Sequence, residues 1–136
     1  MRDEVLKKIL RAQDRKIPIA LITRLADGSQ AIMDRKKSID GDMTFNQQEV
    51  EEVLTCIRDD KSRLLSGGEN FVRVFNPKLR MIVVGAVHIA QALAPMAELA
   101  NFEVTIVDPR GSFASDARFP GVKLICLLYT SDAADE

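Results

Sequence analysis

Residues 85–90, Gly-Ala-Val-His-Ile-Ala, have the types and spacing that suit binding of a phosphate or pyrophosphate group. Gly85 follows an apolar run, and a glycine there permits a tight turn and a close approach of the backbone to a ligand. If a helix starts at this turn, its first amide N–H groups and the positive end of its dipole face the same anion. Asp108 follows about 20 residues later, where a carboxylate accepts hydrogen bonds from an adenosine ribose. These residues predict a ligand site of the dinucleotide-binding type.

The stretch departs from the Gly-x-Gly-x-x-Gly pattern at its second glycine. Ala90 is accepted at the third position, but Val87 stands where a pyrophosphate needs bare backbone. Two interpretations therefore remain open: the turn binds a phosphate, or it only joins a strand to a helix. Asp108 in the same way either contacts a ribose or caps the turn that follows it.

The elements that must position these residues follow from the apolar pattern around them. Residues 81–84 are consecutive apolar residues, as in a strand buried on both faces of a parallel sheet. Residues 102–107 form a second apolar strand. Between the strands a helix is expected whose small residues let it lie close to the sheet, namely Ala86, Ala90, Ala92, Ala94 and Ala97. We predict the first βαβ part of a Rossmann-like parallel sheet, and therefore an α/β fold class.

A small α+β region is predicted in front of this unit. Its expected elements are, in order, a helix (1–16), a hairpin (19–23 and 30–33, with the turn at 26–29), a polar connection (34–42), a second helix that ends before Ser66, and a strand (71–75). The second helix has two alternative capping boxes, one that starts at Thr44 and one that starts at Asn46. We expect the linker at residues 76–78, because Pro77 lacks the amide donor that a strand ladder needs.

The predicted organisation is an N-terminal region (1–76), a truncated Rossmann-like domain (77–125) and a tail (126–136). Residues 121–125 read as a third strand. The tail, CLLYTSDAADE, lacks capping or turn patterns and matches a reading-frame translation of a common transposon-end sequencing adapter. We interpret it as non-native and leave it out of the fold prediction. A Rossmann sheet normally has about six strands, whereas only two or three are predicted here. Because the missing part would cover helix faces and pair strand edges, we expect a marginal, aggregation-prone fragment.

Three segments resemble the XdhC/CoxI family of xanthine dehydrogenase accessory proteins. Residues 85–95 are similar to the family's Gly-Ala-(Gly or Val)-His-(Val or Ile)-Ala-Gln-Ala-Leu-Ala-Pro segment. Residues 107–110 are similar to its Val-Asp-(Asp or Pro)-Arg strand end, and residues 118–120 to its Arg-Phe-Pro. The likeness covers residues 78–125, whereas residues 1–76 match only in their order of elements.

The resemblance implies a non-enzymatic maturation factor that binds molybdenum cofactor (molybdopterin) and delivers it to a molybdenum hydroxylase apo-enzyme. The enzyme that receives the cofactor, here called the client, would be of the xanthine dehydrogenase or carbon monoxide dehydrogenase type. A cysteine desulfurase would be a second partner. A homodimer is one expected assembly of the accessory protein. The residues assigned to cofactor binding are Gly85, Ala86, Val87, His88, Asp108 and Arg110, with no catalytic residue and no metal ligand. The alternative is an NAD(P)-binding oxidoreductase fragment or a non-catalytic nucleotide-binding regulatory module.

For four side chains the sequence leaves two alternative roles each. His88 meets a ligand from the first helical turn, or is a surface residue. Arg110 and Arg118 clamp an anionic pterin phosphate or dinucleotide, or are solvated charges. Cys56 is a small buried side chain beside the apolar stripe of the second helix, or a molybdenum or sulfur ligand.

Composition excludes several classes of function. The 136 residues are 46% hydrophobic with a formal net charge of -1, which gives no general attraction to nucleic acid or to an anionic membrane. Aromatic residues make up 5%, too few for base stacking. There is no apolar run of the roughly 20 residues that span a bilayer. Two cysteines make no disulfide framework, so we expect a cytoplasmic protein.

Overall fold

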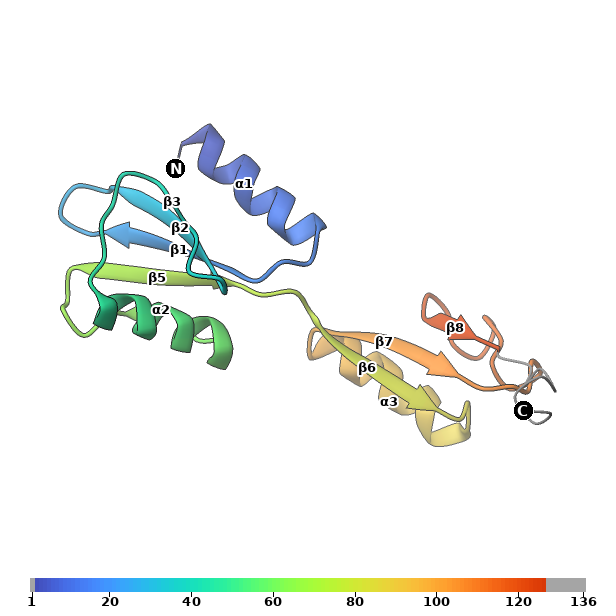
Figure 1. Ribbon diagram of the computed structural model, residues 1–136. Coiled ribbons are helices and arrows are strands. Elements are labelled where there is room, and N and C mark those ends of the chain that lie inside the picture. The colour runs from blue at the N-terminus through green and yellow to red at the C-terminus, as the bar shows by residue number, and fades with distance from the viewer. Residues whose placement is uncertain (1, 127–136) are drawn as a thin grey trace, which may run out of the picture. The chain divides into compact units, whose positions relative to one another are not determined.

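The computed structural model describes residues 2–126 of the chain, which divides into two compact units, Met1–Pro77 and Lys78–Glu136. The first unit contains α1 (Asp3–Asp14), β1 (Ile19–Arg24), β2 (Gln30–Asp34), β3 (Ile39–Asp40), α2 (Gln47–Asp59), β4 (Arg63–Leu64) and β5 (Asn70–Phe75). The second contains β6 (Leu79–Val84), α3 (His88–Leu99), β7 (Phe102–Val107) and β8 (Lys123–Ile125) (Figure 1). This is the predicted α/β class. Residues 127–136, most of the predicted tail, lie outside the described residues.

An antiparallel sheet in the order β3-β2-β1-β5-β4 forms the frame of the first unit. β1 and β2 pair with each other, so the hairpin predicted from the turn at 26–29 is confirmed. Because side chains alternate along a strand, Ile22 packs with Val53 of α2, whereas Leu21 packs with Ile9 of α1. The two helices therefore cover opposite faces of this sheet (Figure 1).

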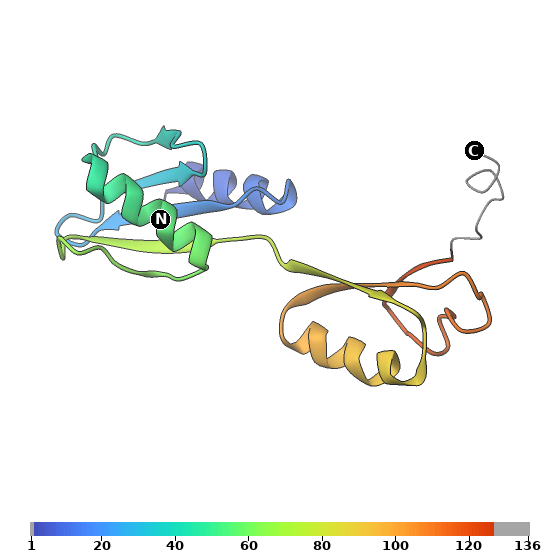
Figure 2. The same cartoon turned by 60° about the horizontal axis from the view of Figure 1, so that its bottom comes forward.

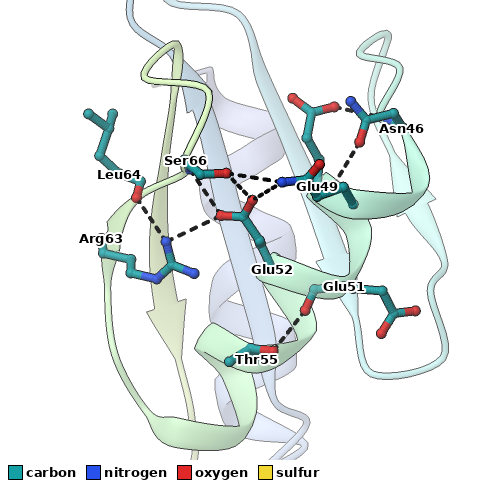
Figure 3. A network of polar contacts seen from close by, with 9 residues as sticks. Asn46, Glu49, Glu51, Glu52, Thr55, Arg63, Leu64 and Ser66 are labelled. Atoms are coloured by element: carbon teal, nitrogen blue, oxygen red, sulfur yellow. Dashed lines mark hydrogen bonds and ion pairs between the residues drawn. The ribbon is translucent and has the colours of Figure 1, made fainter.

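Capping and side-chain bonds fix α2 at its N-terminal half. Of the two predicted capping boxes the second forms: Asn46 Oδ1 accepts from the Glu49 N–H at 2.8 Å, and Glu49 Oε2 accepts from the Asn46 N–H at 2.9 Å. Figure 3 shows Glu52 next to this box, accepting hydrogen bonds from the Ser66 N–H and hydroxyl and from Arg63. These bonds, from Ser66 first, lower the pKa of the Glu52 carboxyl. They tie the segment after α2 back onto the helix.

The C-terminal end of α2 differs from the prediction. The helix ends at Asp59 and not near Ser66, because Asp60 takes a left-handed conformation with φ 53°. Asn76 Nδ2 donates to the Ile57 carbonyl at 2.7 Å, which satisfies one of the carbonyls that a helix end leaves free. The residue in the left-handed conformation at a helix end is usually glycine. Because this position is an aspartate, the sequence did not indicate that the helix ends here.

Two strands of the first unit, β3 and β4, were not predicted. β3 lies inside the expected polar connection, where Met33 pairs with Ile39. β4 occupies part of the expected second helix, where Leu64 pairs with Phe71. Each strand has only two residues, which is too short for an alternation of apolar and polar residues to be recognised in the sequence.

The second unit is a parallel sheet in the order β6-β7-β8 with α3 on one face (Figure 2). Met81 lies opposite Val104, and Ile106 lies opposite Leu124. The side of α3 that faces the sheet is made of small residues, Ala90, Ala94 and Ala97. The predicted βαβ unit, its close helix packing and its third strand are confirmed. Among the described residues, no helix is long and apolar enough to cross a bilayer.

The expectation that β6 is buried on both faces is wrong. Met81 and Val83 pack against the α3 side, but Ile82 is 63% and Val84 82% exposed on the other side. α3 covers one face, and within residues 2–126 no helix of this unit covers the opposite one. A continuous apolar run is buried on both sides only if helices cover both faces of the sheet. A single crossover helix covers only one face.

The double substitution Ile82→Thr, Val84→Thr is expected to reduce self-association of the protein. Threonine keeps the β-branched shape that suits a strand but removes exposed apolar surface, which favours association. Light scattering over a concentration series should show a several-fold lower aggregated fraction. Val83→Thr is the matched control, because it places a hydroxyl on the packed face and should lower stability instead. Equal aggregation of the double variant and the wild type would contradict this expectation.

Candidate ligand site at the carboxyl end of the parallel sheet

The loop 85–87 and Asp108 follow neighbouring parallel strands and meet at the same end of the sheet. Val84 pairs with Val107, and the Gly85 N–H donates to the Val107 carbonyl at 2.8 Å. Gly85 has φ +105°, a conformation that L side chains rarely adopt, so the turn requires glycine. A Cβ at this position would find no atom within 4 Å. The space beside the turn is therefore open.

The first turn of α3 offers free amide donors. The helix begins at His88 with Val87 as N-cap, without a side-chain capping bond and without an acidic residue in its first turn. Within residues 2–126, the N–H groups of Val87, His88 and Ile89 donate no intramolecular hydrogen bond. Amides in this position, together with the helix dipole, favour an anion. The side chains of Val87 and His88 are both exposed.

Asp108 is buried, with 1% of its surface exposed, and both of its oxygens are engaged inside the protein. Oδ2 accepts from the Ala86 N–H at 2.7 Å and from Arg110 Nη2 at 2.8 Å. Oδ1 accepts from the Arg110 N–H at 2.8 Å and from Arg110 Nε at 2.9 Å. These bonds, with the Arg110 side chain contributing most, hold the pKa of the Asp108 carboxyl well below its usual range. Of the two roles left open by the sequence, the structure shows the cap of the following turn.

Arg118 contacts the other side of the loop. Its Nη1 donates to the Ala86 carbonyl at 2.9 Å and to the Phe113 carbonyl at 3.0 Å, and its Nη2 donates to Gln91 Oε1 at 3.1 Å. Phe113 also lies against Arg110, whose guanidinium carbon is 4.2 Å from the ring centroid. The guanidinium groups of Arg110 and Arg118 therefore both make contacts within the protein. Gln91 and Phe113, which sequence reasoning did not single out, complete this arrangement.

Arg110 still presents part of its side chain to the outside. The side chain is 53% exposed, and only Nε and Nη2 are used in the bonds to Asp108. A cation therefore remains near the free amides of the α3 N-terminus. Main-chain donors and one arginine can bind and orient a phosphate without transferring a proton to it.

The first unit holds a buried cysteine and a charged cavity. Cys56 is 1% exposed in the core beside Val53, and burial raises the pKa of its thiol. A cavity of about 710 Å³ lies between α1 and the hairpin, lined by charges of both signs that include Lys8, Arg24 and Asp40. Among the described residues, no group of three or more His, Cys, Asp or Glu side chains is placed to hold a metal ion.

The strand, glycine turn, helix and strand define a Rossmann-like domain that follows the α+β unit in the chain. Residues 81–136 match the family model of the XdhC Rossmann domain. This match covers the three sequence segments that resemble the XdhC/CoxI family, so that resemblance is confirmed.

Comparison with solved structures shows the same fold over nearly the whole chain. A crystal structure described as a xanthine dehydrogenase from Bacillus halodurans superposes on 98% of this chain, with a TM-score of 0.65 and 17% sequence identity. This chain spans 39% of the length of that protein. No curated protein matches the chain.

Asp108→Asn is expected to weaken the second unit and to change its response to acid. The folded-state pKa of the carboxyl lies below the unfolded value of about 3.9. The stabilisation by the charged form is therefore complete above that value and is lost as the pH falls toward the folded pKa. From about pH 5 downward, the wild type should lose more stability than the variant.

The measurement is urea unfolding followed by the NMR signals of Val104 and Ile106, which report on the second unit alone. Asp116→Asn is the control, because Asp116 is exposed in the same connection. If the stabilities of Asp108→Asn and wild type fall in parallel with pH, the bonds to the carboxylate do not stabilise the fold.

Proposed function

We propose that the protein is an accessory factor for maturation of a molybdenum hydroxylase, and that it binds molybdenum cofactor and delivers it to the apo-enzyme. The observation that carries the proposal is the XdhC Rossmann domain match over the residues that form the amide-lined turn. The structural neighbour, described as a xanthine dehydrogenase, supports a recipient enzyme of that class. A cysteine desulfurase is the further partner that we propose.

The residues at the turn fit the anionic part of this cofactor. The N–H groups of Val87, His88 and Ile89 and the exposed part of Arg110 are donors of the kind that bind a phosphate. His88 adds an imidazole that can meet the polar edge of a pterin. When bound, the cofactor supplies the molybdenum centre that the client enzyme uses. Binding through phosphate and pterin leaves the metal end free for transfer, which suits a carrier and requires no catalytic side chain.

His88→Pro is the sharpest test of the amide site. Proline is favoured at the first helical position, and Val87, with φ -85° and ψ 172°, already has the extended conformation required before proline. The variant therefore removes one amide donor with little cost to the helix. We expect roughly tenfold weaker binding of molybdopterin, since a hydrogen bond to a charged group contributes about 1.5 kcal/mol.

His88→Ala separates the amide from the imidazole, because it removes only the side chain. Binding should be measured by anaerobic equilibrium dialysis, together with activation of an apo-hydroxylase by the loaded protein. Equal affinities of His88→Pro and His88→Ala would show that the amide does not contact the cofactor. A wild-type protein that neither binds molybdopterin nor activates an apo-hydroxylase would overturn the proposed function.

Val87→Gly tests the alternative of nucleotide binding. The βαβ unit favours that alternative, but Val87 is 47% exposed at the position where a dinucleotide needs bare backbone. We expect weak binding of NAD by the wild type and only a small gain in NAD affinity in the variant. The reason is that Arg110 still donates hydrogen bonds to both carboxylate oxygens of Asp108. Isothermal titration with NAD provides the measurement. Strong NAD binding by Val87→Gly would favour an NAD-dependent oxidoreductase or a regulatory nucleotide-binding module.

A further inference from the structure

We infer that Arg118 is a positioning residue, which orients the ligand-facing amide of the glycine turn and does not itself contact the ligand. The inference rests on the proposed function, since the ligand is the same phosphate-bearing cofactor. The sequence alone predicts that Arg118 either clamps an anion together with Arg110 or is a solvated charge, whereas the structure gives its guanidinium acceptors within the protein.

The peptide group between Ala86 and Val87 sets the direction of the ligand-facing amide. In a trans peptide the Ala86 carbonyl and the Val87 N–H point in opposite directions. Arg118 Nη1 holds the Ala86 carbonyl at 2.9 Å, on the side of the connection that follows β7. The Val87 N–H is thereby directed away from Arg118, and within residues 2–126 it finds no acceptor of its own. A ligand can supply that acceptor.

The preceding peptide group is held as well. The Ala86 N–H donates to the buried Asp108 carboxylate at 2.7 Å, and Ala86 itself is fully buried. Both peptide groups of Ala86 are thus fixed by side chains from beyond β7. Gly85 alone would leave the turn many conformations, and ordering them at the moment of binding would weaken affinity. The two side chains order the turn before the ligand arrives.

Arg118 can do this because its own position is fixed on several sides. Gln91 of α3 accepts from Nη2 at 3.1 Å, and the Phe113 carbonyl accepts from Nη1 at 3.0 Å. The guanidinium carbon also lies 5.4 Å from the Phe113 ring centroid and 5.6 Å from that of Phe119. A planar fork reaches these partners together, whereas a lysine ammonium supplies the charge at a single point. The contacts therefore depend on the shape of arginine and not only on its charge.

This arrangement also bears on the class of ligand. Asp108 is committed to Ala86 and Arg110, so its carboxylate is not presented to a ribose diol. Recognition then falls to oriented amides, which suit a phosphate monoester. A phosphate-bearing pterin fits this site better than an adenine dinucleotide does.

The test compares Arg118→Lys and Arg118→Ala in the full chain with the control Arg80→Ala. Arg80 is an exposed arginine on β6, on the face of the sheet opposite α3. Two quantities are measured: hydrogen exchange of the Gly85 and Ala86 amides without ligand, since both amides donate hydrogen bonds that hold the turn, and affinity for molybdopterin. We expect Arg118→Lys and Arg118→Ala both to give roughly tenfold faster exchange and roughly tenfold weaker binding. Arg80→Ala should change neither quantity.

The lysine variant separates positioning from direct contact. If Arg118→Lys keeps wild-type affinity and wild-type exchange, the charge alone acts and the inference is overturned. If both variants loosen the turn although the wild type binds no molybdopterin, the proposed function fails while the orienting role of Arg118 stands. Should Arg118→Ala not fold, Gln91→Leu decides the matter by removing one partner of the guanidinium. Faster exchange of the Gly85 and Ala86 amides in Gln91→Leu supports the inference, and unchanged exchange overturns it.

Discussion

The buried Asp108 carboxylate joins the end of one parallel strand to the turn that follows its neighbour, and the second unit depends on this contact. A buried charge is costly unless it is fully hydrogen-bonded, and Asp108 meets that condition through Ala86 and Arg110. Because one acceptor serves both segments, the glycine turn and the connection after β7 hold each other in place. The start of α3, and with it the direction of the free amides, follows from this junction.

A site made chiefly of backbone donors has a limited chemical repertoire. Amides and arginines bind and orient an anion, but at neutral pH they do not exchange protons with it. His88 adds an exposed imidazole at the start of α3.

One-sided burial distinguishes this parallel sheet from a doubly covered one. Small residues let α3 lie close to β7, which buries Ile106 completely, yet the opposite face leaves Ile82 and Val84 in contact with solvent. Parallel sheets normally have helices on both faces. Packing in the second unit therefore comes from the α3 side, whereas in the first unit α1 and α2 cover both faces of the sheet.

The order of the longer elements, the two candidate capping boxes of α2, the parallel pairing of β6 with β7 and the XdhC resemblance could all be predicted from the sequence. These features depend on local propensity, hydrophobic period and short motifs, which neighbouring residues encode directly. The end of α2 at Asp59, the exposed side of β6, the bond between Asp108 and Ala86 and the internal role of Arg118 could not be predicted. Each depends on partners far along the chain, as with Asn76 for the end of α2 and Ala86 for Arg118. The sequence determined which residues gather at the carboxyl end of the sheet, whereas only the tertiary structure decided which of them the protein uses internally and which it leaves for a ligand. The physical reason is that hydrogen bonds between distant residues are fixed by three-dimensional distance, which spacing along the chain does not record.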